Sequence, residues 1–188
     1  MLFRSADDTL VMIDDSIVRG TTLRESIITM LARLDPRRII VVSSAPPIMY
    51  PDCYGIDMSQ LGRFIAFEAA VSLLEERGEL EVLEEVERRC LEQEDQPDER
   101  LTNHVKLIYE RFGLEELSAR IARLLRSPDL DWPGELEVVY QEVEGLREAM
   151  PGHTGDWYFT GDYPTPGGNR VVNTAYLKWR RNDASRSY

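Results

Sequence analysis

Two adjacent carboxylates open the part of this sequence whose residue types are best suited to chemistry. In the stretch "LVMIDDSIVRGTTLRES", an apolar run ends in Asp14 and Asp15, and a polar segment that contains Gly20 follows at once. Paired carboxylates suit a hydrated divalent cation or the vicinal hydroxyls of a sugar. The residues from Ser16 to Thr22 add hydroxyls and backbone N–H groups, and the glycine lets the backbone approach a ligand closely. This order of residues indicates a site for a small anion beside a diol.

The segments around this motif place it at the end of a buried strand. Leu10–Ile13 is predicted to be a strand, and Thr22–Leu34 a helix that starts with a capping box of Thr22 and Glu25. At the carboxyl edge of a parallel sheet, both aspartates can face the crevice in which α/β proteins bind ligands. The helix turns the positive end of its dipole toward the loop, which favours a phosphate. A ligand that carries both a phosphate and a diol is ribose 5-phosphate. The alternative is that the stretch has a structural role alone, with an Asx turn that ends the strand and a threonine that caps the helix.

Three regions of different composition follow one another along the chain. In the first, strand patterns alternate with helical ones, including a strand at Arg38–Ser43 and a helix at Ser59–Arg77, and such alternation predicts a parallel sheet. The second is acidic, with apolar residues at helical spacing. The third contains a strand at Leu136–Gln141, a helical turn and a helix at about Arg170–Arg181. The predicted division is residues 1–78, 79–133 and 134–188.

The composition excludes several classes of partner. The chain has 188 residues and a formal net charge of -12, which repels nucleic acid and anionic lipid. No apolar run is long enough to span a membrane, and charged residues interrupt the start of the chain where a signal peptide would need an apolar segment. Its two cysteines, Cys53 and Cys90, are far apart and fit a reducing compartment. We therefore expect a cytoplasmic protein that binds neither nucleic acid nor membranes.

Several segments carry a resemblance to a known family. "VMIDDSIVRGTT" resembles the phosphoribosyl pyrophosphate (PRPP) signature of type I phosphoribosyltransferases, and "SSAPPIMYPDCYGIDM" extends the resemblance to the glutamine PRPP amidotransferases. "VVYQEVEGLREAM" and "FTGDYPTPGG" resemble that family's last strand, following helix and tail. The resemblance implies an α/β fold with part of the type I phosphoribosyltransferase parallel sheet. It also implies that residues 79–133 are an acidic α-helical insertion and that a C-terminal helix ends the domain.

The resemblance also implies residue roles. Asp14 and Asp15 would hold the ribose hydroxyls and help to bind the Mg²⁺ ion that accompanies PRPP. Tyr54 and Asp57 would line the nucleotide side of the site, although a structural turn with Asp57 as a helix cap explains them equally well. Arg19 either helps to bind phosphate or points into solvent. The residues implied to wrap the 5-phosphate are Ser16, Ile17, Val18, Arg19, Gly20, Thr21 and Thr22.

The activity implied is the formation of 5-phosphoribosylamine from PRPP and glutamine-derived ammonia, in purine biosynthesis, with purine nucleotides as inhibitors. The glutaminase half and the upstream pyrophosphate-binding loop of that family are not recognised in the sequence. We therefore expect a fragment of a longer, homo-oligomeric enzyme that binds PRPP or ribose 5-phosphate and is inactive alone. A non-catalytic PRPP or purine-nucleotide sensor is the alternative.

Some members of the family that this sequence resembles hold an iron–sulfur cluster through four cysteines. Asp52 and the segment 155–158 stand here at positions where those relatives have cysteines, and Cys53 is interpreted as a packing residue. Because a cluster needs four thiolates, no iron–sulfur cluster is expected in this chain.

Overall fold

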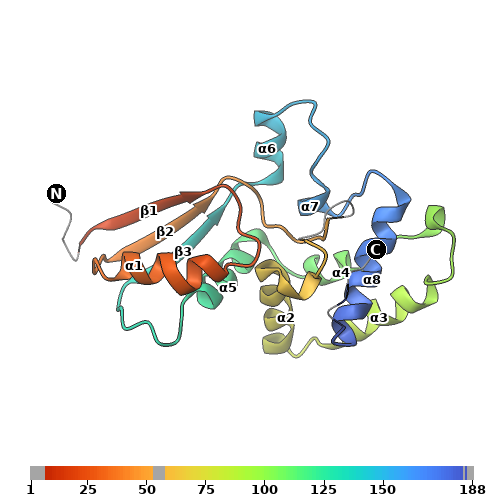
Figure 1. Cartoon of the computed structure of the whole chain (residues 1–188), viewed down its shortest axis with the longest axis horizontal. Helices are drawn as coiled ribbons and strands as arrows, with labels where there is room; N and C mark the ends of the chain where they lie inside the picture. Colours follow the sequence, from red (N-terminus) through yellow and green to blue (C-terminus); the bar gives the residue numbers. More distant parts are fainter. Residues whose placement is uncertain (1–6, 53–57, 184, 186–188) are drawn as a thin grey trace.

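The computed structural model describes residues 7–52, 58–183 and 185, and shows an α/β protein (Figure 1). No helix in these residues is long and apolar enough to cross a membrane. A π-helical stretch, Leu23–Ile27, runs directly into α1, and short 3₁₀ turns precede α2 and α4. In chain order the strands and helices are β1 (Thr9–Asp14), α1 (Ile28–Ala32), β2 (Arg38–Ser43), α2 (Ile65–Arg77), α3 (Glu81–Glu92), α4 (Lys106–Tyr109), α5 (Leu114–Leu125), β3 (Glu135–Tyr140), α6 (Val143–Ala149), α7 (Trp157–Thr160) and α8 (Pro166–Arg180).

The sheet is parallel and its described strands lie in the order β1-β2-β3. The register pairs Asp14 with Ser43 and Ser43 with Tyr140, so all three strands end at the same level. β2 is rich in β-branched residues, which favour a pleated and packed strand. The parallel α/β fold predicted from the alternating patterns is confirmed.

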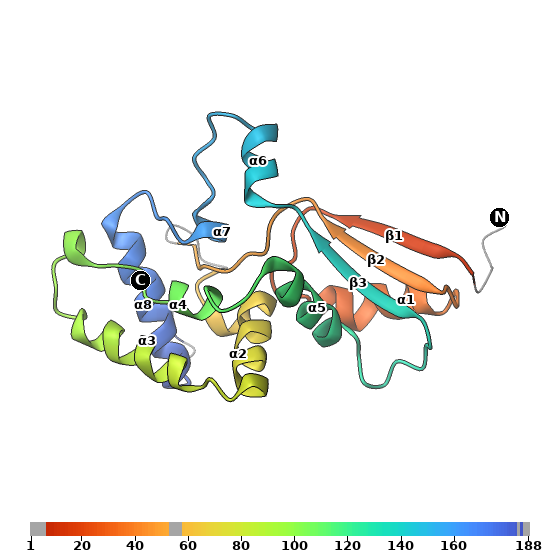
Figure 2. The ribbon, with the colours of Figure 1, turned by 180° about the vertical axis from the view of Figure 1, so that it is seen from behind.

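Helices cover one face of this sheet. Figures 1 and 2 show α1 and α5 on the same side of the strands, and α5 packs against β3 and α2. On that side Ile39 and Val41 are completely buried. On the opposite face of the sheet, the β1 residues Val11 and Ile13 are 60% and 75% exposed. α5 thus belongs to the layer that supports the sheet, although it lies within the region predicted as an insertion.

A second group of helices packs beside the sheet layer. α3 contacts both α4 and α8. The ring of Phe67 in α2 meets that of Trp179 in α8 edge to face, with centroids 4.7 Å apart. The hydroxyl of Tyr176 donates a hydrogen bond to the carbonyl of Leu83 at 2.6 Å and so ties α8 to α3. Edge-to-face aromatic pairs of this kind add to the stabilisation that burial of the rings provides.

Three helix boundaries differ from those predicted. Thr22 already has helical dihedral angles and makes no capping hydrogen bond, so the predicted capping box is wrong: the helix begins directly after Gly20. The helix predicted from Ser59 is broken at Phe64, which is extended (φ −81°, ψ 127°). The break frees the N–H of Ile65 to bond outside its own helix. α8 begins at Pro166, four residues before the predicted start, because proline is well tolerated in the first turn.

Candidate functional site

The two aspartates lie where the sheet ends. Asp14 is the last residue of β1 and Asp15 the first residue beyond it. The neighbouring strand fixes this turn, because the Ser44 N–H donates to the Asp14 carbonyl at 2.9 Å and the Ser44 hydroxyl to the Asp15 carbonyl at 3.3 Å. The pair therefore stands at the carboxyl edge of a parallel sheet, the common position of ligand sites in open α/β folds.

Both carboxylates are oriented by the backbone that follows them. The Asp15 N–H donates to Asp14 Oδ1 at 3.1 Å, and the Ser16 N–H donates to Asp15 Oδ1 at 2.9 Å. Partial burial, together with the neighbouring Asp15 carboxylate, raises the pKa of Asp14, although the bond from the Asp15 N–H opposes this. A charged Asp14 in this position favours a cation or a hydroxyl donor close by.

An open cleft of about 820 Å³ begins at Asp14 and follows the loop. Asp15 does not line this cleft; it lines a neighbouring hollow instead. Ile17 is buried and Val18 half-buried, so these two side chains belong mainly to the core. The cleft is lined by Asp14, Ser16, Ile17, Val18, Arg19, Gly20, Thr21, Thr22, Leu23, Ile27 and Met58.

The conformation of the loop depends on Gly20. Its φ of +66° lies in the left-handed region, and a Cβ at this position would meet Ile65 Cδ1 and Leu125 Cδ2 at 2.6 Å. The Arg24 N–H donates to the Gly20 carbonyl at 2.9 Å, which is the first turn of the helix. The N–H of Ile65 donates to the carbonyl of Val18 at 2.9 Å and anchors the loop from the other side. The loop is therefore held against the core, with a helix N-terminus at the cleft.

This arrangement can hold an anion and a diol at the same time. The first N–H groups of a helix have no partner within the helix and carry a partial positive charge, which attracts phosphate. The hydroxyls of Thr21 and Thr22 lie on exposed residues at the same helix start. Asp14 lies at the other end of the loop, as a diol beyond the phosphate would require.

A second hollow of about 350 Å³ adjoins Asp15 on the side of α6 and α7. Arg147 of α6 forms a two-pronged ion pair with Asp156, at 2.5 and 2.9 Å, along one wall. His153 and Phe159 also line it, together with Asp15. Sequence reasoning assigned no role at the site to Arg147, Asp156 or Phe159, because nothing local in the sequence links them to the aspartates.

Two predicted site residues, Tyr54 and Asp57, lie outside the described residues, as does Cys53. Their roles remain predictions. Met58, the first described residue after them, lines the cleft, so the segment that follows them borders the site.

The residues present fit Mg²⁺ held jointly with a ligand. Within the described part of the chain, no three His, Cys, Asp or Glu side chains gather as a metal site. Mg²⁺ is commonly bound through one or two carboxylates, with substrate phosphates and water as the other ligands. Asp14 offers one carboxylate to the cleft, and Asp15 offers a second from the adjoining hollow.

Comparison with known proteins finds a partial similarity. No family model matches the chain. The amidophosphoribosyltransferase of Bacillus subtilis is 48% identical over 62 residues, which is 33% of this chain and 13% of that protein. Those of Pasteurella multocida and Haemophilus influenzae are each 44% identical over 61 residues, 32% of this chain and 12% of each relative. The matched segment is thus about a third of this chain and about an eighth of each of these relatives.

Proposed function

We propose that the cleft beside Asp14 binds the 5-phosphoribosyl group of PRPP or ribose 5-phosphate, together with Mg²⁺. The observation that carries this proposal is the cleft, in which a carboxylate and a helix N-terminus lie at opposite ends of one loop. The partial similarity to amidophosphoribosyltransferases supports it, because that name describes enzymes that transfer a phosphoribosyl group.

Each end of the loop has a distinct role in this proposal. The backbone N–H groups near Gly20 and the hydroxyls of Thr21 and Thr22 bind the 5-phosphate. Asp14 and Asp15 accept hydrogen bonds from the ribose hydroxyls and contribute to the Mg²⁺ site. When bound, Mg²⁺ neutralises charge on the pyrophosphate of PRPP and makes it a better leaving group. In this proposal the two carboxylates also stabilise positive charge that develops on the ribose ring.

The reaction that this binding serves is transfer of ammonia to the ribose C1. The nitrogen lone pair forms the C–N bond, the bond from C1 to the pyrophosphate oxygen breaks, and the nitrogen gives up a proton, so that 5-phosphoribosylamine and pyrophosphate result. We propose binding rather than turnover for these 188 residues. Release of ammonia from glutamine needs an activated nucleophile. Burial and the charge of Glu87 raise the pKa of the Cys90 thiol to about 12, so this cysteine is not a nucleophile at neutral pH.

Calorimetry with ribose 5-phosphate, with and without Mg²⁺, tests the proposal. We expect binding that Mg²⁺ strengthens, and an affinity at least about tenfold lower in the double variant Asp14→Asn with Asp15→Asn, because one charge-assisted hydrogen bond alone contributes roughly 1.5–3 kcal/mol. Asp129→Asn with Asp131→Asn removes the same charge from an exposed loop and should leave the affinity unchanged. Equal binding by the wild type and both double variants would contradict the assignment of the aspartates, and no binding by the wild type would contradict the proposal itself.

A further inference from the structure

β3 has an edge that no other described strand covers. Among the described residues it pairs with β2 alone. The N–H groups of Glu135 and Gln141 donate to carbonyls on the β2 side, at 3.0 and 3.1 Å. Since backbone groups alternate along a strand, the N–H and C=O groups of Leu136, Val138 and Tyr140 point away from β2. Such an edge is a template for pairing with another strand.

β3 lacks the features that keep an exposed edge from pairing. Its sequence, ELEVVY, contains no proline and no lysine, and its register with β2 is uninterrupted. Glu135 and Glu137 both form ion pairs with Arg38 of β2, and Glu135 does so through two hydrogen bonds at 2.6 and 2.9 Å. The charges of these two glutamates are therefore balanced in part within the chain and do not block the edge.

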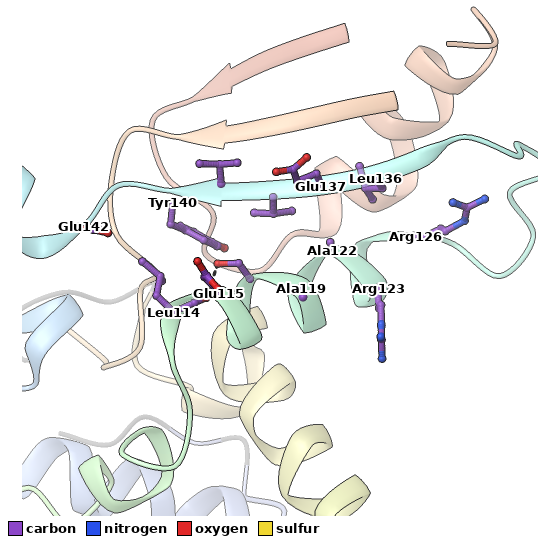
Figure 3. Close-up of a pocket in the computed structure, with 13 residues that line it drawn as sticks. Leu114, Glu115, Ala119, Ala122, Arg123, Arg126, Leu136, Glu137, Tyr140 and Glu142 are labelled. Carbon is purple, nitrogen blue, oxygen red and sulfur yellow. Dashed lines mark hydrogen bonds between the residues drawn. The ribbon is translucent and has the colours of Figure 1, made fainter. Parts of the chain in front are cut away.

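α5 lies along the same edge and runs antiparallel to β3 (Figure 3). At its C-terminal end the guanidinium of Arg126 donates to the carbonyls of Trp132 and Gly134, directly before β3 begins. At its other end Glu115 lies beside Tyr140, the last residue of the strand. A groove of about 690 Å³ runs between the two elements. β3 and α5 thus form one surface, along which the helix and the strand edge are both presented.

The charged side chains on this surface are complementary to themselves about its midpoint. Arg123 lies toward the end where β3 begins, and Glu115 and Glu142 lie at the end where it finishes (Figure 3). All three residues are exposed, and none forms an ion pair within the part of the chain that the structure describes. Ala119 stands halfway between Glu115 and Arg123 on α5. A twofold axis at this level brings Arg123 of each copy beside Glu115 and Glu142 of the other.

We propose that two copies of this chain dimerise through β3 and α5, with the two β3 strands antiparallel and a twofold axis between them. Pairing centred on Val138 places Leu136 of each copy opposite Tyr140 of the other, and the outward N–H and C=O groups then bond across the axis. The two sheets become one continuous sheet. None of the residues that line this groove lines the phosphoribosyl cleft, and the proposal does not depend on the proposed function.

The side chains that this pairing brings together are compatible. On the open face of the sheet, Glu137 lies beside Val139 of the second copy, and Glu135 lies beside its Gln141. No two acidic side chains of the strands therefore stand opposite each other, which would destabilise the pair. On the other face the two α5 helices meet at the level of Ala119, whose small side chain permits a close approach. A second copy thus supplies the backbone groups and the opposite charges that this surface needs.

Sedimentation equilibrium with charge-reversed variants tests the proposal. We expect the wild type to dimerise with a Kd in the micromolar range. Arg123→Glu should dimerise at least about tenfold more weakly, because the twofold axis turns one reversed charge into two repulsive contacts. Glu115→Arg should also weaken the dimer. The exposed Arg33→Glu, at the end of α1, changes the net charge as Arg123→Glu does and should leave the dimer unchanged.

A mixture of the two variants gives a sharper test. Copies with Arg123→Glu are acidic at both ends of the surface, and copies with Glu115→Arg carry the matching basic residue. An equimolar mixture should therefore form heterodimers at concentrations at which neither variant dimerises alone. A mixture that stays monomeric would overturn the proposal. A wild type that stays monomeric at about 1 mM would also overturn it, and would leave the edge to a partner of different sequence.

Amide hydrogen exchange locates the contact on the strand edge. The N–H groups of Leu136, Val138 and Tyr140 should exchange at least about tenfold more slowly in the dimeric wild type than in monomeric Arg123→Glu, because the pairing gives them acceptors. Equal exchange of all three in a dimer and a monomer would place the interface elsewhere and contradict the proposal. A dimer that neither charge reversal weakens would contradict it as well.

Discussion

At the scale of single residues, the surroundings of Asp14 disfavour the charged form of its carboxyl group. Partial burial and the carboxylate of Asp15 raise its pKa above the usual value of 3.8. An acid whose pKa is raised by folding makes its stabilising contribution at low pH and loses it as the pH rises through the folded-state pKa. At neutral pH the charged Asp14 therefore lowers the stability of the folded protein, and a bound cation would relieve this.

Asp14→Asn should therefore raise the urea midpoint of unfolding at pH 7 and leave it nearly unchanged at pH 3, where the carboxylate is protonated. The amide oxygen can still accept the hydrogen bond from the Asp15 N–H, so the turn is kept. Unfolding is followed by circular dichroism in EDTA at both pH values, with the exposed Asp129→Asn as the control. A lower midpoint for Asp14→Asn at pH 7 would show that its charge stabilises the fold after all.

At the scale of elements, the loop depends on Gly20, and a second glycine provides the control. Gly20 and Gly78 have nearly the same φ, +66° and +71°, but a Cβ at Gly78 meets nothing within 4 Å. Gly78→Ala should cost about 1–2 kcal/mol for the left-handed conformation alone. Gly20→Ala should cost a further 1–3 kcal/mol or so, because the new methyl group overlaps Ile65 and Leu125. Denaturant unfolding of the two variants measures the difference, and equal losses would contradict the close packing of the loop.

The sequence predicts those elements whose determinants are local. Arg38–Ser43 was predicted with its observed bounds, because a run of β-branched residues determines it. Most residues that line the cleft, Asp14 and those from Ser16 to Thr22, stand in one run of the sequence, and the sequence analysis singles out this run. It does not single out Leu23, Ile27 or Met58, and the predicted Asp15 lines the neighbouring hollow. The break at Phe64 was not predictable, because it depends on a hydrogen bond from Ile65 to a carbonyl far away in the sequence.

Other elements depend on tertiary contacts. The segment before Arg170 resembles a loop, because proline and two glycines follow one another, yet it forms the first turn of α8. At Gly168 a side chain would overlap the ring of Tyr163, so this glycine allows a close approach rather than ending the helix. The hollow beside Asp15 likewise joins β1, β2, α6 and α7, and only the fold brings these together. The predicted divisions at residues 78 and 133 remain predictions.

At the scale of the whole molecule, the described residues cover one face of the sheet and leave the other face open. Parallel sheets normally have both faces covered, because their crossover helices lie on either side. Here Val11, Ile13 and Val139 on the uncovered face are 60%, 75% and 40% exposed. Their side chains add little to the stability of this chain, whereas those that face α1 and α5 form its core.

A matched pair of substitutions in neighbouring strands measures this asymmetry. Threonine suits a strand as well as isoleucine does, so the two variants differ mainly in the burial that they remove. Ile13→Thr should change the free energy of unfolding by less than about 0.5 kcal/mol and lower the fluorescence of bound anilinonaphthalene sulfonate. Ile39→Thr, at a fully buried position, should cost about 2–4 kcal/mol, because it leaves a cavity and buries a hydroxyl. Similar losses from both variants would mean that Ile13 is buried in solution, and would contradict a sheet with one open face.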